Sequence, residues 1–370
     1  MILEVIFFVS IFLVIYNVFL YPCLIFLLAK IFHNEVKSAN TNIKVSLICS
    51  ANNEEKDIGQ KIKNCLELNY ENLEIIIIDD GSTDKTNEIC NEYKKKYGDK
   101  FKLIEINPRG GKINALNKAV PKSCGEILLF SDANTYYDKN VVKELVKHFA
   151  DRKVGCVTGH VKLIAKNELK EGEGFFTRIE RTIHDSESSI YSSIGLDGAM
   201  YALRRELYEP LEGYFIEDFV MGMNIIKKGY RVIYESKAKG WEESAKSYVM
   251  EMKRRSRIVA GGFQCLKFMT FLIKKPFILF EFTSHKFLRW ILAELMVLIL
   301  VLNIVLFNSN VLFQYLLYAQ ILFYFLSIMG FFIKKLSFIT YFVLMQIASF
   351  LGLIKFIFGL QKVNWTRFKR

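Results

Sequence analysis

Several patterns that would place this chain in a common protein class are missing from its sequence. Its seven cysteines include no Cys-x-x-Cys pair, which indicates reduced thiols rather than a zinc site or a disulfide framework. Its five histidines show no spacing typical of a metal site, so we assign them no role. No Gly-x-Gly-x-x-Gly follows the first predicted strand, which argues against a dinucleotide oxidoreductase. The net charge of +12 forms no basic stripe with aromatics, so we expect anionic lipid and phosphorylated ligands and no nucleic acid.

Charge itself is missing from three long apolar runs. Val5 to Ala29, Leu295 to Ile333 and Leu336 to Ile354 contain no Asp, Glu, Lys or Arg. Because about 20 apolar residues cross a bilayer as a helix, the first and last runs predict one span each, and the middle run predicts two that turn near Asn308. The N-terminal run lacks the basic flank and cleavage site of a signal peptide and is expected to remain as an anchor. With 52% hydrophobic residues, the composition indicates a soluble domain joined to membrane helices.

The basic residues beside these runs predict a topology. The stretch from Met1 to Glu4 has no basic side chain, whereas the first run is followed by Lys30, Lys37 and Lys44. The positive-inside rule therefore predicts an integral protein of the cell membrane whose central domain is cytoplasmic. Three C-terminal spans would leave the basic tail (Lys362, Arg367, Lys369 and Arg370) outside, against the same rule. Either one apolar stretch is re-entrant or interfacial, or the rule fails at this end.

Short apolar strands alternate with helical segments between residues 43 and 166, which predicts an α/β fold with a doubly wound, mostly parallel sheet. The predicted strands are Val45–Cys49, Leu73–Ile78, Phe101–Ile106, Glu126–Phe130 and Val154–Val161. The predicted helices are Glu55–Leu68, Lys85–Tyr97, Gly111–Ala119 and Asn140–Phe149. Residues 167–245 are less regular, with a helix expected at Phe175–Ser193. We therefore expect an anchor at 1–32, a central domain at 33–245, amphipathic interfacial helices at 246–286, and membrane helices with a basic tail at 287–370.

Acidic residues follow two of the predicted strands. Asp79 and Asp80 end one strand, and two adjacent buried carboxylates repel each other unless a donor or cation uses them, so we favour ligand binding there. Asp132 and Asn134 follow another strand and share one face of an extended segment. Mg²⁺ or Mn²⁺ binds through such carboxylates together with substrate phosphates. Alone, Asp132-Ala133-Asn134 is better explained by a surface turn. Its position after an apolar strand, at the same edge as Asp79 and Asp80, reverses that preference, because the carboxyl ends of parallel strands form one ligand-binding edge.

Two further segments carry candidate groups. Gly110-Gly111-Lys112 lacks the Walker spacing of an ATPase but can face a diphosphate at the start of the next predicted helix. Glu217 and Asp218 precede an apolar helical turn. Acids in a first helical turn are common, since they interact favourably with the helix dipole. The functional alternative is a general base whose acidic neighbour orients it.

The basic segment Lys253-Arg254-Arg255-Ser256-Arg257 has two interpretations as well. A membrane-facing charge is the default for such a run. Alternatively, Arg254 and Arg257 lie three residues apart on one helix face, where two guanidinium groups can hold a phosphate.

The order of these motifs resembles that of the membrane-bound family-2 glycosyltransferases, the relatives of cellulose, chitin and hyaluronan synthases with a GT-A fold. The resemblance covers about Lys44 to Gln264 and the flanking membrane segments. Four elements recur in order, namely Val45–Glu55, Asp79-Asp80-Gly81-Ser82, Asp132-Ala133-Asn134 and Glu217-Asp218. Two of them depart from the family pattern, with Ser50 and Asn52 in place of Pro and Tyr, and Asn134 in place of the second Asp of DxD. The family's QxxRW motif is represented by Arg254-Arg255-Ser256-Arg257-Ile258.

The resemblance implies a role for each candidate. Glu54 with Asp79 or Asp80 would hold the nucleotide, Lys112 would lie near the diphosphate, and Asp132 would meet Mg²⁺ or Mn²⁺. Asp218 matches the catalytic base of the family. Gly198 and Arg204 fall where the family lines its acceptor site.

The function expected from this resemblance is inverting transfer of a sugar from a nucleotide-sugar, by family habit a UDP-sugar, to a polysaccharide or polyprenyl-linked acceptor at the membrane. The absent Trp of QxxRW makes synthesis of long chains less expected than transfer itself. The alternative is a membrane-anchored protein that binds sugar nucleotides and whose catalysis has decayed or depends on a partner.

Overall fold

A computed structural model describes residues 1–164, 170–213, 216–245 and 247–360. Its centre is an eight-stranded mixed sheet in the order β3-β2-β1-β4-β7-β6-β8-β5. The strands are β1 (Val45–Ala51), β2 (Leu73–Asp80), β3 (Phe101–Ile106), β4 (Ile127–Asp132), β5 (Tyr136–Tyr137), β6 (Val154–Ile164), β7 (Met200–Arg204) and β8 (Arg231–Glu243). The α/β class is confirmed, as are all five strands predicted from the alternating pattern.

The parallel part of the sheet comprises β3, β2, β1 and β4. Beyond β4 the sheet is mixed, since β7 runs antiparallel to both β4 and β6, while β6 pairs in parallel with β8. Neither β7 nor β8 was predicted, because the chain between residues 167 and 245 shows no regular alternation of strands and helices. Because β7 is antiparallel to both of its neighbours, β6 and β8 run in the same direction as β1 to β4, and within the described residues only β7 and β5 run against them. The prediction of a mostly parallel sheet is therefore confirmed.

Alternate residues of the central strands point to opposite faces and create two hydrophobic cores. Ile76, Ile78 and Phe130 belong to one core, whereas Ile75, Ile77 and Leu129 belong to the other. Helices cover both faces, and buried side chains from each pack into these cores. The helices of one face are α3 (Ile58–Leu66), α4 (Thr86–Tyr97) and α6 (Val141–Val146), and those of the other are α5 (Lys112–Ala119), α8 (Glu217–Lys227) and α9 (Tyr248–Cys265).

One core extends far beyond the central domain. Its buried members include Val259 and Phe263 of α9 and continue through Ile278 to Trp290. These residues lie on α9, on the 3₁₀ helix Leu266–Lys274, on α10 (Pro276–Glu281), on the π-helical turn η7 (Phe282–Phe287) and on α11 (Leu288–Trp290). The segment that was expected to form separate interfacial helices at 246–286 therefore shares its core with the sheet.

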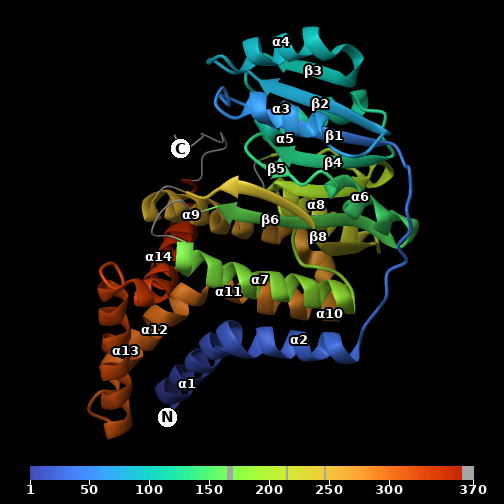
Figure 1. Ribbon diagram of the computed structural model, residues 1–370. Coiled ribbons are helices and arrows are strands. Elements are labelled where there is room, and N and C mark those ends of the chain that lie inside the picture. Colours follow the sequence, from blue (N-terminus) through green and yellow to red (C-terminus); the bar gives the residue numbers. More distant parts are fainter. Residues whose placement is uncertain (165–169, 214–215, 246, 361–370) are drawn as a thin grey trace.

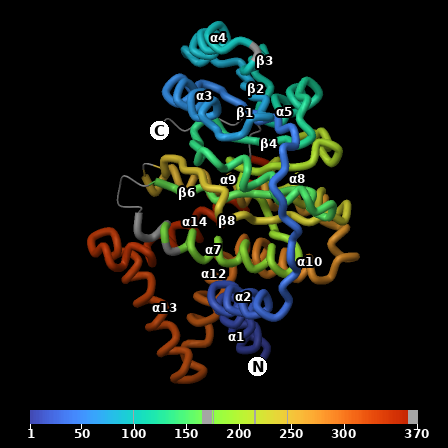
Figure 2. Tube along the Cα trace, turned by 45° about the vertical axis from the view of Figure 1, so that its right-hand side comes forward, coloured from blue at the N-terminus to red at the C-terminus, as the bar shows by residue number. Residues whose placement is uncertain are grey.

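The apolar runs fold into helices at one end of the molecule. The chain begins with α1 (Ile2–Ile15), the π-helical turn Tyr16–Leu20 and α2 (Tyr21–Ile31), and its later helices include α12 (Leu292–Val305), α13 (Val311–Met329) and α14 (Ser337–Ile357). In Figures 1 and 2, α1, α12 and α13 extend from the end opposite β3. The helix α7 (Lys170–Ile190) lies between the sheet and α2 in Figure 1 and packs against α2.

In the part of the chain that the structure describes, three helices are long and apolar enough to cross a membrane, namely Ile2–Ile31, Val311–Met329 and Lys334–Ile357. The segments Pro276–Trp290 and Leu292–Val305 pass the same test only as a pair, and a bend of 61° separates them. The middle apolar run, expected to form two spans, does form two helices that turn between Val305 and Val311. Of these two, Val311–Met329 passes the test alone, whereas Leu292–Val305 passes it only as part of the bent pair. The bent pair has the shape of a broken span or of the re-entrant segment considered from the charge distribution. The basic tail lies outside the described residues.

Candidate active site

The acidic strand ends meet at one edge of the parallel half of the sheet. β1 lies between β2 and β4, with Ala51 opposite Asp79 and Ser50 opposite Asp132. The two acidic motifs therefore flank the end of β1, as expected from the strand pattern. This is the carboxyl edge of the sheet, where open α/β folds bind their ligands.

Hydrogen-bond donors of the protein offset the repulsion between the carboxylates of Asp79 and Asp80 at the end of β2. Both residues are buried, with 4% of Asp79 and 3% of Asp80 exposed. Asp79 accepts hydrogen bonds from the backbone N–H of Ser82 and from Nδ2 of Asn87 at 3.2 and 2.9 Å. The two carboxylate oxygens of Asp80 accept from the N–H groups of Gly110 and Gly111 at 2.8 and 2.7 Å. Asp80 thus fixes the loop that leads to Lys112.

Lys112 joins three separate segments of the site. Its Nζ lies 2.8 Å from Oδ1 of Asp132 and 2.5 Å from Oε1 of Glu217, and it donates to the carbonyl oxygen of Gly198 at 3.3 Å. Burial alone would lower the pKa of Lys112, but the carboxylates of Asp132 and Glu217 raise it above its ordinary value. The side chain therefore carries a positive charge at the strand edge.

Asp218 lies at the first turn of α8, beside Glu217. Its Oδ1 accepts a hydrogen bond from the N–H of Phe219 at 2.8 Å. Burial and, next, the charge of Glu217 raise the pKa of Asp218 to about 7. A carboxylate with this pKa can accept a proton near neutral pH, which is the property required of a general base.

Two acids that sequence reasoning missed lie in the same cluster. Asp197 precedes Gly198, and burial together with the charge of Glu242 raises its pKa to about 7, with smaller contributions from Asp132 and Asp218. Glu242 belongs to β8 and accepts a hydrogen bond from Nδ2 of Asn134 at 3.3 Å. The strand β8 escaped prediction, so no sequence signal placed Glu242 here. The pair Asp197-Gly198 was visible only as a stretch that resembles the family's acceptor site.

A buried lysine that sequence reasoning also missed supports the Asp132 segment. Nζ of Lys61 on α3 donates to Oγ of Ser131 at 2.7 Å and to the carbonyl oxygen of Thr135 at 2.5 Å. It also lies 3.9 Å from the centre of the Tyr137 ring. Lys61 is fully buried. It therefore fixes the backbone on both sides of Asp132 and Asn134.

The arginines of α9 have separate environments. Arg254 forms a two-bond ion pair with Glu251 of its own helix, with distances of 2.8 and 2.7 Å. Burial and Arg254 lower the pKa of Arg257, and the carboxylates of Glu217, Asp132 and Asp218 oppose this shift. Arg257 is thus close to the acid cluster, whereas Arg254 is held by Glu251. A joint phosphate clamp requires Arg254 to leave that ion pair.

Arg204 and Glu54 complete the set of predicted residues. Arg204 pairs with Ile127 at the start of β4, so it lies at the opposite edge of the sheet from Asp132. Its guanidinium donates to the carbonyl oxygens of Val154, Phe149 and Asp151. We therefore correct the expectation that Arg204 lines an acceptor site, because its donors stabilise the start of β6. Glu54 follows β1 and is buried, and its N–H donates to Oγ1 of Thr86.

The donor set at this edge fits a hard divalent cation. Asp132, Asn134 and Glu242 supply carboxylate and amide oxygens, which are the ligands that Mg²⁺ and Mn²⁺ prefer. Burial is the main cause of the raised pKa of Asp197, and the charges of Glu242 and Asp132 add to it, so these acidic groups lie close together. Lys112 and Arg257 offset part of their negative charge.

Comparisons with known proteins agree with this architecture. Residues 46–210 match the family profile described as Glycosyl transferase family 2. The chain is 30% identical over 256 residues to the probable glycosyltransferase YdaM of Bacillus subtilis (strain 168), across 64% of this chain and 60% of that protein. It is 26% identical over 234 residues to the poly-beta-1,6-N-acetyl-D-glucosamine synthase of Staphylococcus aureus (strain COL), across 60% of this chain and 55% of that protein. The matches thus span little more than half of these relatives.

A solved structure resembles nearly the whole chain. It is the mannosyltransferase PcManGT from Pyrobaculum calidifontis in complex with GDP-Man and Mn²⁺, with a TM-score of 0.74 and 22% sequence identity. The match covers 96% of this chain and 99% of that chain, so the candidate membrane helices are included. At this identity the similarity establishes the fold, and it confirms the predicted fold class.

Proposed function

We propose that this protein is an inverting, metal-dependent glycosyltransferase, because residues 46–210 match the Glycosyl transferase family 2 model. It transfers a sugar from a nucleotide-sugar to a hydroxyl of a polysaccharide or lipid-linked acceptor at the cytoplasmic face of the cell membrane. The observation that carries the proposal is the convergence of Lys112, Asp132, Glu217 and Asp218 at the carboxyl edge of β4. Each residue suits one requirement of the reaction.

Asp218 is the proposed base. Its carboxylate accepts the proton of the acceptor hydroxyl while that oxygen attacks the anomeric carbon, and the bond to the nucleotide diphosphate breaks with both electrons leaving on the diphosphate. Such assistance contributes about 10² to 10⁴ in rate. Glu217 adds negative charge beside the base and holds Lys112 at 2.5 Å. Gly198 has no side chain, so the Asp218 carboxylate can lie directly against its backbone.

Cationic groups stabilise the departing diphosphate. Lys112 and Arg257 supply fixed positive charge, and the Gly110-Gly111 loop, held by Asp80, sets the position of Lys112. We assign nucleotide binding to Glu54 and Asp79, with Arg254 as a second phosphate contact. Asp132 with Asn134 and Glu242 would hold Mg²⁺ or Mn²⁺, which when bound neutralises charge on the leaving diphosphate.

The donor and acceptor that we propose follow those named for similar proteins. The polysaccharide synthase named above supports an N-acetylhexosamine as the transferred sugar and a growing polysaccharide as acceptor. UDP as its carrier rests on the family resemblance. The mannosyltransferase solved with GDP-Man and Mn²⁺ supports a GDP-linked hexose and the metal. A lipid-linked acceptor suits the candidate membrane helices.

The test is release of nucleotide diphosphate by the detergent-purified full chain, with Mn²⁺ or Mg²⁺, across UDP-sugars and GDP-mannose, with and without membrane lipid extract. Metal-dependent release with one donor, lost in Asp218→Asn, supports the proposal and identifies the donor. Stimulation by lipid extract supports a lipid-linked acceptor. Metal-dependent nucleotide binding without release from any donor would overturn catalysis in favour of a sugar-nucleotide-binding protein.

A further inference from the structure

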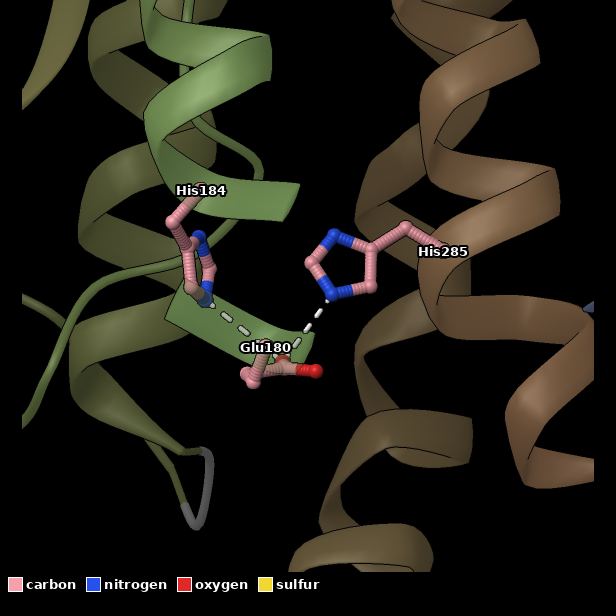
Figure 3. A group of neighbouring side chains, drawn as sticks. All are labelled: Glu180, His184 and His285. Atoms are coloured by element: carbon pink, nitrogen blue, oxygen red, sulfur yellow. Dashed lines mark hydrogen bonds and ion pairs between the residues drawn. The ribbon is translucent and has the colours of Figure 1, made fainter. Parts of the chain in front are cut away.

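A second cluster of metal-binding side chains lies outside the candidate active site. Glu180 and His184 are four residues apart on one face of α7, and His285 comes from η7 (Figure 3). Oε1 of Glu180 lies 2.9 Å from Nε2 of His285 and 3.5 Å from Nε2 of His184. The three potential ligand atoms lie within 4.8 Å of one another. A tetrahedral zinc site needs its ligand atoms roughly 3.4 Å apart.

Both imidazole rings are held by their outer nitrogens. Nδ1 of His184 lies 2.7 Å from Oγ of Ser193, and Nδ1 of His285 lies 2.7 Å from Oε1 of Glu187. Metal-bound histidines usually donate this second N–H to a carboxylate or another oxygen, which fixes the ring and its tautomer. The two remaining nitrogens both face Glu180, as Figure 3 shows. The two imidazole rings are therefore oriented as metal-bound histidines are, with their Nδ1 atoms already hydrogen-bonded to Ser193 and Glu187.

Glu180 uses its two oxygens differently. Oε2 is paired with Arg289, whereas Oε1 faces both imidazoles. A carboxylate ligand is commonly held in this manner, with one oxygen on the metal and the other on a protein donor. Lys286 competes for the site, since its Nζ lies 3.0 Å from the same Oε1. An ion bound to Oε1 therefore has to displace the ammonium group of Lys286.

Two further acids lie beside the cluster. Glu187 and Glu281 are both fully buried, and Glu187 holds the ring of His285. Among the described residues, neither oxygen of the Glu281 carboxylate has a hydrogen-bond partner. The cations of this region, Lys286 and Arg289, pair with Glu180 instead, and Arg255 also interacts with Glu180. A divalent ion on His285 would add positive charge beside Glu187, which holds that ring.

We infer that Glu180, His184 and His285 form a site for a divalent transition-metal ion of the Zn²⁺ type that fastens α7 to the helical segment leading into the candidate membrane helices. Two imidazoles and one carboxylate suit Zn²⁺ better than Mg²⁺ or Ca²⁺, which prefer oxygen ligands alone. Partial exposure leaves an entry path, because 32% of the Glu180 side chain and 15% of the His184 side chain are accessible. The inference does not depend on the proposed function.

The test measures metal binding directly in the detergent-purified full chain. Every protein carries Asp132→Ala, so that the proposed catalytic ion does not contribute. After treatment with a chelator, Co²⁺ is titrated while visible absorption is recorded, and bound Zn²⁺ is measured by elemental analysis in parallel. We expect one equivalent of Zn²⁺ and an intense Co²⁺ absorption band typical of a four- or five-coordinate site. Absence of both would overturn the inference and leave an ordinary buried ion-pair network.

Variants locate the ion. His184→Ala and His285→Ala should each lose the Co²⁺ band, and Ser193→Ala should weaken Zn²⁺ binding about 10-fold as an outer partner. Lys286→Met should tighten binding, because it removes the competing ammonium. His148→Ala is the matched control, since His148 pairs with Glu235 elsewhere in the domain, and it should retain the band. If His285→Ala fails to fold, Glu180→Gln serves in its place. Retention of the band in folded His184→Ala would also overturn the inference.

Discussion

The carboxylate of Asp218 lies where a side chain at residue 198 would begin. A methyl group on Gly198 would lie 2.6 Å from Oδ2 of Asp218, which is closer than a Cβ atom and a non-bonded oxygen approach each other in proteins. Gly198→Ala should therefore displace the proposed base. Because small displacements of a catalytic group have large effects on rate, we expect kcat to fall about 100-fold with little change in the melting temperature.

Steady-state kinetics and a thermal melt of the purified variant check this expectation. Gly59→Ala in α3 is the matched control, because a methyl group there meets its nearest neighbour at 3.6 Å. Equal activity of the two alanine variants would remove Asp218 from the base assignment.

The pH dependence of activity should report Asp218. A general base works only when ionised, and burial beside Glu217 raises the pKa of Asp218 to about 7. We expect kcat/KM to fall about 10-fold for each pH unit below this value, because protonation removes the base. The measurement is a pH profile of nucleotide release at saturating metal. A rate that stays constant between pH 5 and 7 would contradict the assignment.

Removing the charge of Lys112 should weaken donor binding. Its Nζ lies between Asp132 and Glu217, so Lys112→Met leaves two carboxylates facing each other near the incoming diphosphate. We expect kcat/KM for the nucleotide-sugar to fall by at least about 100-fold, equivalent to about 2.7 kcal/mol. Lys118→Met, on the same helix and away from this cluster, is the control. A loss of similar size in Lys118→Met would point to a general electrostatic effect.

Lys61 should affect activity by positioning Asp132 for the metal, and not by contact with the substrate. Lys61→Met keeps the side-chain length but removes the donors to Ser131 and Thr135. We expect the concentration of Mn²⁺ that supports half-maximal activity to rise about 10-fold, while excess Mn²⁺ restores much of the rate. A metal titration of activity distinguishes this result from simple unfolding, which excess metal cannot reverse.

Arg204 should contribute to stability and not to substrate binding. Arg204→Met leaves the carbonyl oxygens of Val154, Phe149 and Asp151 without their charged donor, and each such loss costs about 1–3 kcal/mol. We expect a lower melting temperature and an unchanged KM for the acceptor at temperatures where the variant is folded. A raised acceptor KM would restore the role first expected from the sequence.

The sequence predicted those parts of the site that follow strong local patterns. Apolar strands that end in Asp79 and Asp132 place both acids at one sheet edge, because strand direction fixes where a parallel strand ends. Asp197 and Glu242 were not predicted, since they reach the cluster through the antiparallel β7 and the parallel β8, and strand pairing over such distances leaves no periodic signal.

The histidines illustrate the same limit. His184 and His285 have no informative spacing in the chain, yet helix packing brings their rings to a centroid separation of 5.1 Å. Likewise, a motif that resembles the family's acceptor site suggested that Arg204 binds the acceptor. The register between β4 and β7 instead places Arg204 beside Ile127, at the end of β4 opposite Asp132. Local motifs identify residue types, and tertiary pairing decides which of them meet.

The contact between α14 and α9 links the bilayer to the proposed chemistry. A methyl group on Gly352 of α14 would lie 2.7 Å from the carbonyl oxygen of Ser256, the residue before Arg257, so the two helices touch backbone to backbone. A candidate membrane span therefore supports the helix that carries Arg257, the proposed phosphate-binding cation. Membrane thickness biases the tilt of such a span. Lipid chain length thus becomes a physical variable of the enzyme, and a catalytic fragment cut off before α14 would lose the surface on which α9 rests.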